Sequence, residues 1–383
     1  MRITVVSPQL PTPAFPMRGV RHFEQLRLFA KAGHSVRAVV PLGWTPAPLG
    51  PRQEIDDAGI LVAHPRYFRP PLRRWRSAAG IGAALERRFF ARAAASELSQ
   101  PDIVLAHSAT FPGGLLGRVG HAPFVVTLHN NEPFDSEPQS KLVRRVVTRT
   151  LRAVDCVVYQ SEALRRHGFG LAGSHESRII PIGIDVFYDL PTAPPSRFTV
   201  CCVARLVPSK GVDMVVRAFA RLAATLPEAR LVVVGDGRER CSLELLAETL
   251  RLNGKVDFVG PLDRRGAQEK MANSSVLAMP SAPESLGAVY FEAMSLAVPA
   301  LGTEGEGISE YIQHGVDGIL IPRGNEERLY DELKRLAMDR ERARRIGQAG
   351  RKLFLSRGPS WQANVAAHLA LFDELRRKRA DRP

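Results

Sequence analysis

Two glutamates eight positions apart stand where a predicted strand gives way to a predicted helix. The apolar run 276–279 is followed by two prolines, which predicts a short buried strand that ends in a tight loop. From Leu286 the apolar residues recur at helical spacing, and Pro299 ends the pattern. We therefore expect Glu284 in the loop and Glu292 about two turns along the helix.

The same junction offers backbone donors for an anion. The N–H groups of Ser285, Leu286 and Gly287 precede the helix, and the N-terminus of a helix favours a phosphate. Two carboxylates beside a phosphate site suit a ligand that carries both hydroxyl and phosphate groups, because the carboxylates then bind sugar and ribose hydroxyls. An ordinary strand–turn–helix with one capping and one surface carboxylate has the same spacing, so this signal is weak alone.

A pair of cations occupies a second loop of the same kind. Arg205 and Lys210 lie between a predicted strand, 198–203, and a helix that runs to about residue 222. Two cations beside the positive end of a helix suit a diphosphate. Cations five residues apart are also common by chance.

Both stretches resemble motifs of one enzyme family. The Glu284-x7-Glu292-Ala-Met stretch is similar to the E-x7-E signature of retaining GT-B glycosyltransferases of family 4 (glycosyl transferases group 1). Arg205-Leu-x3-Lys210-Gly resembles that family's Gly-Arg-Leu-x3-Lys-Gly, with Ala204 in place of the glycine. The resemblance covers about residues 1–372. It implies that Glu284 acts at the sugar and that the other residues named so far bind the donor: Arg205, Lys210, Ser285, Leu286, Gly287 and Glu292.

Two residues of the first half complete the implied site. Gly19 follows a proline-rich loop where the family usually has two glycines; because Arg18 takes the first place, Gly19 is either a donor contact or a turn glycine. His129 follows the predicted strand 124–127, at the strand end where α/β sheets hold ligands. A lone histidine is usually structural, but the resemblance makes His129 catalytic, beside the donor sugar. His107 is a weaker candidate.

The length and pattern predict an α/β protein of two domains. Strands alternate with helices along 383 residues, which favours parallel sheets. The resemblance implies the GT-B architecture, with two Rossmann-like domains facing across a cleft and a last helix that crosses back to the first. We expect an acceptor-side domain at 1–190, a nucleotide-sugar domain at 197–358, and a returning helix with a basic tail at 359–383. Residues 41–75 are expected to be irregular.

The composition restricts the setting of the protein. Hydrophobic residues make up 45% and charged residues 24%, which indicates a globular chain. No apolar run approaches the roughly 18 residues that cross a bilayer, and no signal peptide is recognised. Four cysteines show neither metal nor disulfide spacing, so we expect reduced thiols and a cytoplasmic location. The chain lacks Asp-x-Asp, so no cofactor and no obligatory metal are expected.

The net charge of +14 points to an anionic partner. Residues 66–92 carry eight arginines and one acid, and more arginines follow in the predicted helix 141–152. An anionic membrane or an anionic substrate suits this excess, whereas nucleic acid does not, because no nucleic-acid motif is present.

The function implied by these features is retaining sugar transfer from a nucleotide diphospho-sugar to a glycan or polyprenyl-linked acceptor. Gly59-Ile60 and His64-Pro65-Arg66-Tyr67 resemble the teichuronic-acid and exopolysaccharide subgroup, which implies cell-surface polysaccharide synthesis at the inner face of the plasma membrane. Two alternatives stay open: a nucleotide-sugar 2-epimerase of the same fold, and a non-catalytic nucleotide-sugar binder.

Overall fold

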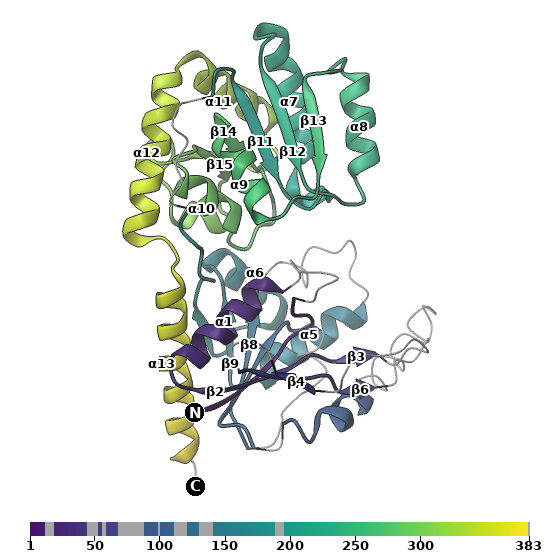
Figure 1. The fold of residues 1–383 in the computed structure, drawn as a ribbon, viewed down its shortest axis with the longest axis vertical. Coiled ribbons are helices and arrows are strands. Elements are labelled where there is room, and N and C mark those ends of the chain that lie inside the picture. Colours follow the sequence, from purple (N-terminus) through teal and green to yellow (C-terminus); the bar gives the residue numbers. More distant parts are fainter. Residues whose placement is uncertain are drawn as a thin grey trace. The chain divides into compact units, whose positions relative to one another are not determined.

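The computed structural model describes residues 1–11, 19–43, 53–55, 59–67, 88–98, 100–110, 121–129, 141–187 and 195–381. The chain divides into two compact units (Figure 1). Unit 1 comprises residues 1–183 together with 361–383, and unit 2 comprises residues 184–360. The last segment of the chain thus belongs to the same unit as the first.

Unit 1 is built on a sheet of eight strands, seven of them parallel. In spatial order they are β10 (Ser177–Ile179), β9 (Cys156–Tyr159), β8 (Phe124–Leu128), β7 (Ile103–His107), β1 (Arg2–Val6), β2 (Ser35–Val39), β5 (Leu61–Ala63) and the antiparallel β4 (Gln53–Ile55). The chain leaves β1 for β2 on one side and later returns to β7 on the other. Successive strands are therefore added on opposite sides of the sheet, and the strand order reverses between β1 and β7. Strands β3 (Leu42–Gly43) and β6 (Arg66–Tyr67) form a separate parallel pair.

Helices cover both faces of this sheet because its strands are apolar on both sides. Helices α1 (Val20–Lys31) and α13 (Trp361–Ala380) share one core, in which Phe29 and Phe372 pack with Ile103 and Val125. Helices α5 (Lys141–Ala153) and α6 (Glu162–Ala172) share the other core with the even-numbered residues of β7 and β8. Odd-numbered positions of β7 and β8 consequently face α1 and α13.

Helix α13 is held in unit 1 by polar contacts as well as by apolar packing. The Gln25 amide donates to Asn364 Oδ1 at 2.7 Å, and Arg379 pairs with Asp155 at 3.1 Å. Figure 1 shows α13 running beside α1. The expectation that the last helix returns to the first part of the chain is confirmed.

Unit 2 contains a second parallel sheet. Its six strands lie in the order β13 (Val256–Gly260), β12 (Arg230–Val234), β11 (Thr199–Val203), β14 (Val276–Ala278), β15 (Ala300–Thr303) and β16 (Ile319–Ile321). Its helices are α7 (Val212–Thr225), α8 (Arg240–Thr249), α9 (Arg264–Ala272), α10 (Ala288–Ser295), α11 (Glu326–Met338) and α12 (Arg340–Arg357). The direction of the sheet order changes between β11 and β14.

Two local expectations are wrong. Residues 41–75 are not irregular throughout, because β5 extends the parallel sheet and β3 pairs with β6. The sequence Gly315-Val316-Asp317-Gly318 also suggests a hairpin-like turn between Ile312 and residues 320–322, which is wrong because β16 pairs in parallel with β15. The proline-rich linker at 190–196, where the sequence places the domain boundary, lies outside the described residues as far as residue 194, and so does Arg18.

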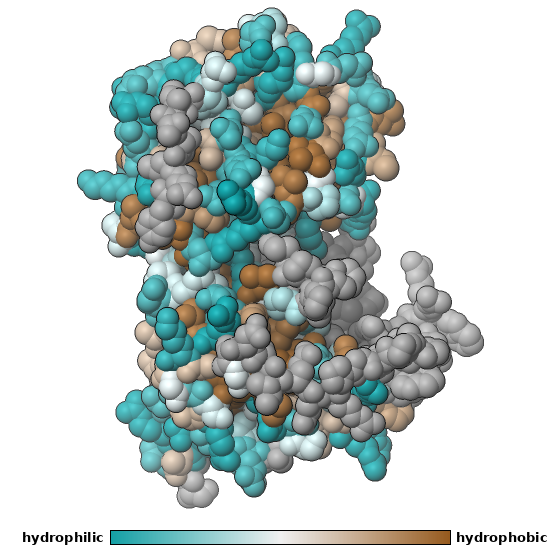
Figure 2. All heavy atoms as spheres, viewed as in Figure 1, coloured by the Kyte–Doolittle hydropathy of each residue, from teal (hydrophilic) through white to brown (hydrophobic). Residues whose placement is uncertain are grey.

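Polar side chains dominate the face of the molecule seen in Figure 2, and apolar ones appear there in small groups. The large apolar side chains that are exposed among the described residues are scattered over both units, for example Phe89 in unit 1 and Leu245 in unit 2. No helix among the described residues is both long enough and apolar enough to span a bilayer.

Candidate functional site

The predicted donor loops of unit 2 lie side by side at the change of strand order. Loop 204–211 follows β11 and loop 279–287 follows β14, and these strands are hydrogen-bonded neighbours. Ala282 N donates to Ser209 O at 2.9 Å, which ties the loops together. Gly211 has φ +63°, and a Cβ atom there would lie 2.9 Å from the Pro280 carbonyl oxygen. Only glycine allows this close approach at a left-handed position.

The contact between these two loops brings the side chain of Lys210 to the side chain of Glu284. Lys210 Nζ lies 2.5 Å from Glu284 Oε2, and the two side chains are only 19% and 10% exposed. Burying a charged group is costly unless the group is paired. The sequence assigned Lys210 to the diphosphate and Glu284 to the sugar, and the structure places the two in one ion pair.

A third loop supports Glu284, and sequence reasoning missed it. Glu306, itself buried, accepts from Glu284 N through Oε2 at 2.6 Å. Gly307 N donates to Glu284 O at 3.3 Å. This loop follows β15, the next strand of the sheet. The sequence Glu304-Gly-Glu-Gly307 after the apolar run 300–303 is the signal that would have found it.

Four further predicted donor residues lie on the same loop as Glu284 and on the helix that follows it. Ser285 and Leu286 are buried in the loop, and Gly287 precedes α10, which begins at Ala288. Glu292 lies half-buried in the second turn of α10. Helix α10 is anchored to the end of β14 because the Tyr290 hydroxyl donates to Met279 O at 2.5 Å.

The environment of Tyr290 reports on the charge of the site. Burial raises the pKa of Tyr290 well above its usual value, and the neighbouring negative charge of Glu284 raises it further. The phenol is therefore a fixed neutral donor. It holds α10 in place through its hydrogen bond to Met279 O.

Arg205 occupies an exposed position at the start of its loop. The buried Leu206 beside it fixes the backbone, because Leu206 N donates to Asp236 O at 2.9 Å and Leu206 O accepts from Glu239 N at 3.1 Å. Loop 235–239 follows β12, the other neighbour of β11. Three adjacent strands therefore position Arg205, Lys210 and Glu284.

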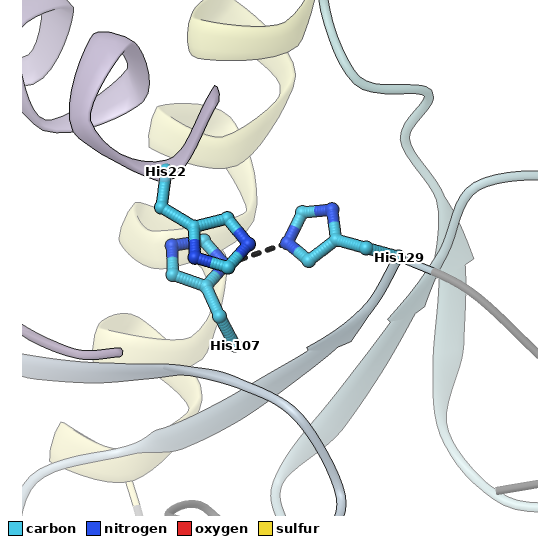
Figure 3. A group of neighbouring side chains, drawn as sticks. All are labelled: His22, His107 and His129. Atoms are coloured by element: carbon cyan, nitrogen blue, oxygen red, sulfur yellow. Dashed lines mark hydrogen bonds between the residues drawn. The ribbon is translucent and has the colours of Figure 1, made fainter. Parts of the chain in front are cut away.

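Unit 1 carries a second polar group at its own change of strand order (Figure 3). His107 ends β7, His129 follows β8, and His22 projects from α1. His107 Nδ1 lies 2.7 Å from His129 Nε2. The rings of His22 and His107 stack at 4.2 Å between centroids, with 9° between their planes. The sequence predicted His129 and named His107, but it gave no signal for His22.

Burial controls the protonation of these histidines. It lowers the pKa of His22 to about 4, partly offset by a hydrogen bond with the Gln9 backbone. It also lowers the pKa of His107 and His129 well below their usual value, and the neighbouring histidines lower both further. All three imidazoles are therefore neutral at pH 7.

Gly19 has a structural reason for its identity. Its φ is +68°, and a Cβ atom there would clash with the Gln9 backbone. It immediately precedes α1. Both observations account for a turn glycine, so its contact with a donor stays a prediction.

Each unit therefore places polar loops at the carboxyl edge of a parallel sheet where the strand order reverses, which is where open α/β sheets bind ligands. The fold is that of the GT-B class. It is similar to sucrose-phosphate synthase from Thermosynechococcus elongatus, with a TM-score of 0.79, 20% identity and 98% of each chain covered. It is also similar to Anabaena Alr3699/HepE in complex with UDP, with a TM-score of 0.71, 19% identity, and 97% and 100% covered.

Two family models divide the chain between them. "Glycosyltransferase Family 4" matches residues 20–186, and "Glycosyl transferases group 1" matches residues 191–353. Together they account for most of both units. The chain belongs to the group 1, family 4 glycosyltransferases, as its motifs predicted.

Curated relatives match over parts of their length. A GDP-mannose-dependent α-(1-6)-phosphatidylinositol monomannoside mannosyltransferase of Mycobacterium tuberculosis is 31% identical over 55% of this chain and 60% of its own. A GDP-mannose-dependent monoacylated α-(1-6)-phosphatidylinositol monomannoside mannosyltransferase of Corynebacterium glutamicum is 28% identical over 62% of this chain and 67% of its own. N-acetyl-α-D-glucosaminyl L-malate synthase of Bacillus anthracis is 37% identical over 37% of each chain. The match thus spans between about a third and two thirds of these relatives.

Proposed function

We propose that this protein transfers a sugar, with retention of anomeric configuration, from a nucleotide diphospho-sugar to a glycan or polyprenyl-linked acceptor. The observation that carries the proposal is the buried Lys210–Glu284 pair at the carboxyl edge of β11 and β14. A diphosphate that approaches Lys210 competes with Glu284 for the cation. The carboxylate is thereby released toward the hydroxyls of the sugar.

The chemistry assigned to these residues is electrostatic. Arg205, Lys210 and the N-terminus of α10 neutralise the charge that develops on the leaving diphosphate, so an oxocarbenium-like sugar forms at low cost. Glu292 binds the ribose, and Glu284 binds sugar hydroxyls near the reacting face. His129 acts beside the sugar as a neutral imidazole. Protein cations stabilise the leaving group, so the reaction itself is proposed to need no metal.

The acceptor side is assigned to unit 1 on the basis of its charge. Helix α5 buries Val147 and Leu151 and exposes Arg144, Arg145 and Arg149. These arginines line a surface hollow of about 600 Å³. An exposed arginine contributes about 1 kcal/mol near an anionic leaflet. We propose that this face meets the inner surface of the plasma membrane, in cell-surface polysaccharide synthesis.

Names of relatives support a role in surface glycans. An exopolysaccharide phosphotransferase of Streptomyces coelicolor is 34% identical over 39% of this chain. A lipopolysaccharide core glycosyltransferase of Rhizobium meliloti is 27% identical over 57%. Arg73, Arg74 and Arg76, which belong to the arginine-rich stretch 66–92, lie outside the described residues.

Nucleotide release from candidate donors, measured with and without acceptor, tests the activity. Glu292→Ala should mainly weaken donor binding, whereas Glu284→Ala and His129→Ala should mainly reduce turnover at saturating donor. An epimerase would isomerise the donor without acceptor, and a pure binder would release no nucleotide. Near-normal turnover of both Glu284→Ala and His129→Ala would refute the assigned roles.

Sedimentation with liposomes tests the membrane contact. Binding should require anionic lipid and decrease with salt. It should be lost when Arg144, Arg145 and Arg149 are changed to Glu, and retained in the matched triple change of Arg323, Arg342 and Arg345 in unit 2. Indifference of the unchanged protein to anionic liposomes at low salt would contradict the proposal and favour a soluble acceptor.

A further inference from the structure

The three histidines of unit 1 form a group that the proposed transfer reaction does not explain. One ring nitrogen from each of His22, His107 and His129 lies within 4.8 Å of the others. Within the described ranges, no second group of three histidine, cysteine or acidic side chains is gathered this closely. Figure 3 shows the His22 ring stacked on His107, with one of its nitrogens on the side of the His107–His129 hydrogen bond.

The strand register explains why the three rings meet. His107 is the last residue of β7, and His129 comes directly after the last residue of β8. Both numbers are odd, so both side chains project toward the face covered by α1. His22 reaches them from that helix, which follows β1, the other neighbour of β7. The cluster lies where the strand order reverses, which is the ligand-binding edge of such a sheet.

Ser7 fixes His22 in the tautomer that a metal requires. Ser7 Oγ donates its only proton to Gln9 O at 2.7 Å, so it accepts at its contact of 2.9 Å with His22 Nδ1. His22 therefore carries its proton on Nδ1 and presents the lone pair of Nε2. A hydrogen bond from the second ring nitrogen to a fixed acceptor is the usual support of a metal-bound histidine.

His107 and His129 share one proton at the centre of the cluster. One of His107 Nδ1 and His129 Nε2 donates and the other accepts over 2.7 Å. His107 is 2% exposed, and its Nε2 has no hydrogen-bond partner among the described residues. Nothing described therefore holds the His107 proton on one particular nitrogen.

We propose that His22 Nε2, His107 Nδ1 and His129 Nε2 bind one transition-metal ion of the Zn²⁺ class. The metal replaces the shared proton between His107 and His129, and the ring that carried this proton takes it on its other nitrogen, so the three imidazoles stay neutral. Imidazole nitrogens suit Zn²⁺, Co²⁺ and Ni²⁺, and they suit Ca²⁺ or Mg²⁺ poorly. Three histidines leave one position of a tetrahedral ion open for water.

Binding requires only side-chain adjustment. Zn–N bonds of about 2.0–2.1 Å place tetrahedral ligand nitrogens roughly 3.3 Å apart. The His107–His129 separation of 2.7 Å is slightly shorter than this, and the 4.8 Å limit of the group is longer. The His22 ring must also turn out of its parallel stack to point its lone pair at the ion.

The site shares His129 with the proposed transfer reaction. A metal on His129 Nε2 withdraws that nitrogen from the sugar, so metal and transfer should exclude one another. Only this consequence rests on the proposed function. The metal site itself stands on the geometry of the three rings.

Zinc and cobalt titration of the tag-free full-length chain tests the site. Cys241→Ser serves as background, because Cys241 is an exposed thiol. After chelator treatment, competition with a chromophoric chelator should give one Zn²⁺ per chain with a dissociation constant of about 1 µM or below. Co²⁺ should produce the visible absorption of a tetrahedral ion, and Zn²⁺ should remove it.

Four variants identify the ligands. His22→Phe and His107→Phe should each weaken Zn²⁺ binding by more than about 100-fold, and Ser7→Ala by about 10-fold. His121→Gln, at an exposed histidine outside the cluster, should bind as the unchanged chain does.

His22→Cys guards against a folding defect. It should keep Co²⁺ binding and add a thiolate-to-cobalt charge-transfer band in the near ultraviolet. An unchanged circular dichroism spectrum and an unchanged unfolding transition of unit 1, which carries every one of these substitutions, report that each variant is intact.

The failures of the two proposals are distinguishable. Absence of saturable Zn²⁺ binding, or binding undiminished in both phenylalanine variants, overturns the metal site whatever the enzyme does. If Zn²⁺ binds as expected, transfer should be inhibited, and chelator or His22→Phe should relieve the inhibition. Full transfer by the zinc-loaded protein would instead overturn the role of His129 in the proposed function.

Discussion

Substitutions of Lys210 and of Glu284 should affect one another's cost in folding stability, and both should change the affinity for the nucleotide. Both side chains are mostly buried, and they meet at 2.5 Å. Removing one partner of a fully buried pair costs about 3–5 kcal/mol, and an exposed pair is worth less than about 1 kcal/mol. Because these side chains keep a tenth to a fifth of their exposure, we expect Lys210→Met to lower the free energy of unfolding of unit 2 by about 2 kcal/mol.

The double variant separates the lost pair from lost packing. In Lys210→Met/Glu284→Gln neither charge of the pair is left without its partner, so at least about 1 kcal/mol of the Lys210→Met loss should return. The free energy of unfolding is measured by urea denaturation, with Lys352→Met, at an exposed lysine of α12, as the matched control. Strictly additive single and double variants would refute the coupling.

The same variants address the donor. Loss of a charge-assisted contact to a diphosphate costs about 1.5–3 kcal/mol, so Lys210→Met should weaken nucleoside diphosphate binding about 10- to 150-fold. Glu284→Gln should bind the nucleotide at least as tightly as the unchanged chain, because it removes the competitor for the cation. Calorimetric titration measures both. Unchanged nucleotide affinity in Lys210→Met would remove Lys210 from the diphosphate site.

Three further outcomes are expected. Glu306→Ala should destabilise unit 2 by about 1–3 kcal/mol because it leaves the Glu284 N–H unpartnered, and Glu306→Gln should restore most of the loss in thermal unfolding. Gly211→Ala should lower the free energy of unfolding by about 2 kcal/mol or more. Gly254→Ala, at a glycine whose φ is also positive but whose surroundings are open, should lower it by only about 1 kcal/mol. Equal losses would contradict the close contact between Gly211 and Pro280. Burial lowers the pKa of His368 to about 4. The unfolded chain therefore takes up the proton first, and His368 should account for about 3 kcal/mol of the stability lost between pH 6.5 and 4, in addition to the loss caused by His22, His107 and His129. His368→Leu should reduce the slope by this share, and an unchanged slope would contradict the assignment.

The sequence predicted those elements whose evidence is local. Strands such as β11 and β14 are continuous apolar runs bounded by turns, and α10 is bounded by a glycine and a proline. Strand β15 was missed because its four residues directly follow the proline that ends the preceding helical pattern. Strand β5 was missed because a strand of only three residues has little periodicity of its own.

The sequence named candidate residues for the site but not how those residues are arranged in space. Lys210 and Glu284 are 74 positions apart, so their contact depends on the pairing of β11 with β14, which no local pattern specifies. His22, His107 and His129 come together for the same reason, through the order of β1, β7 and β8. Long-range register is the information that the residues alone did not supply.

The return of α13 to unit 1 has a consequence for biosynthesis. A ribosome releases residues 184–360 as one uninterrupted stretch, so unit 2 can fold as soon as that stretch has emerged. The core beneath α1 must wait for Phe372 and Leu375, which are supplied only by α13. Ile184 N donates to Pro359 O at 3.1 Å, so unit 2 brings its own two ends together. The later-made unit is therefore expected to fold first and to deliver the last helix to the waiting sheet of the earlier one.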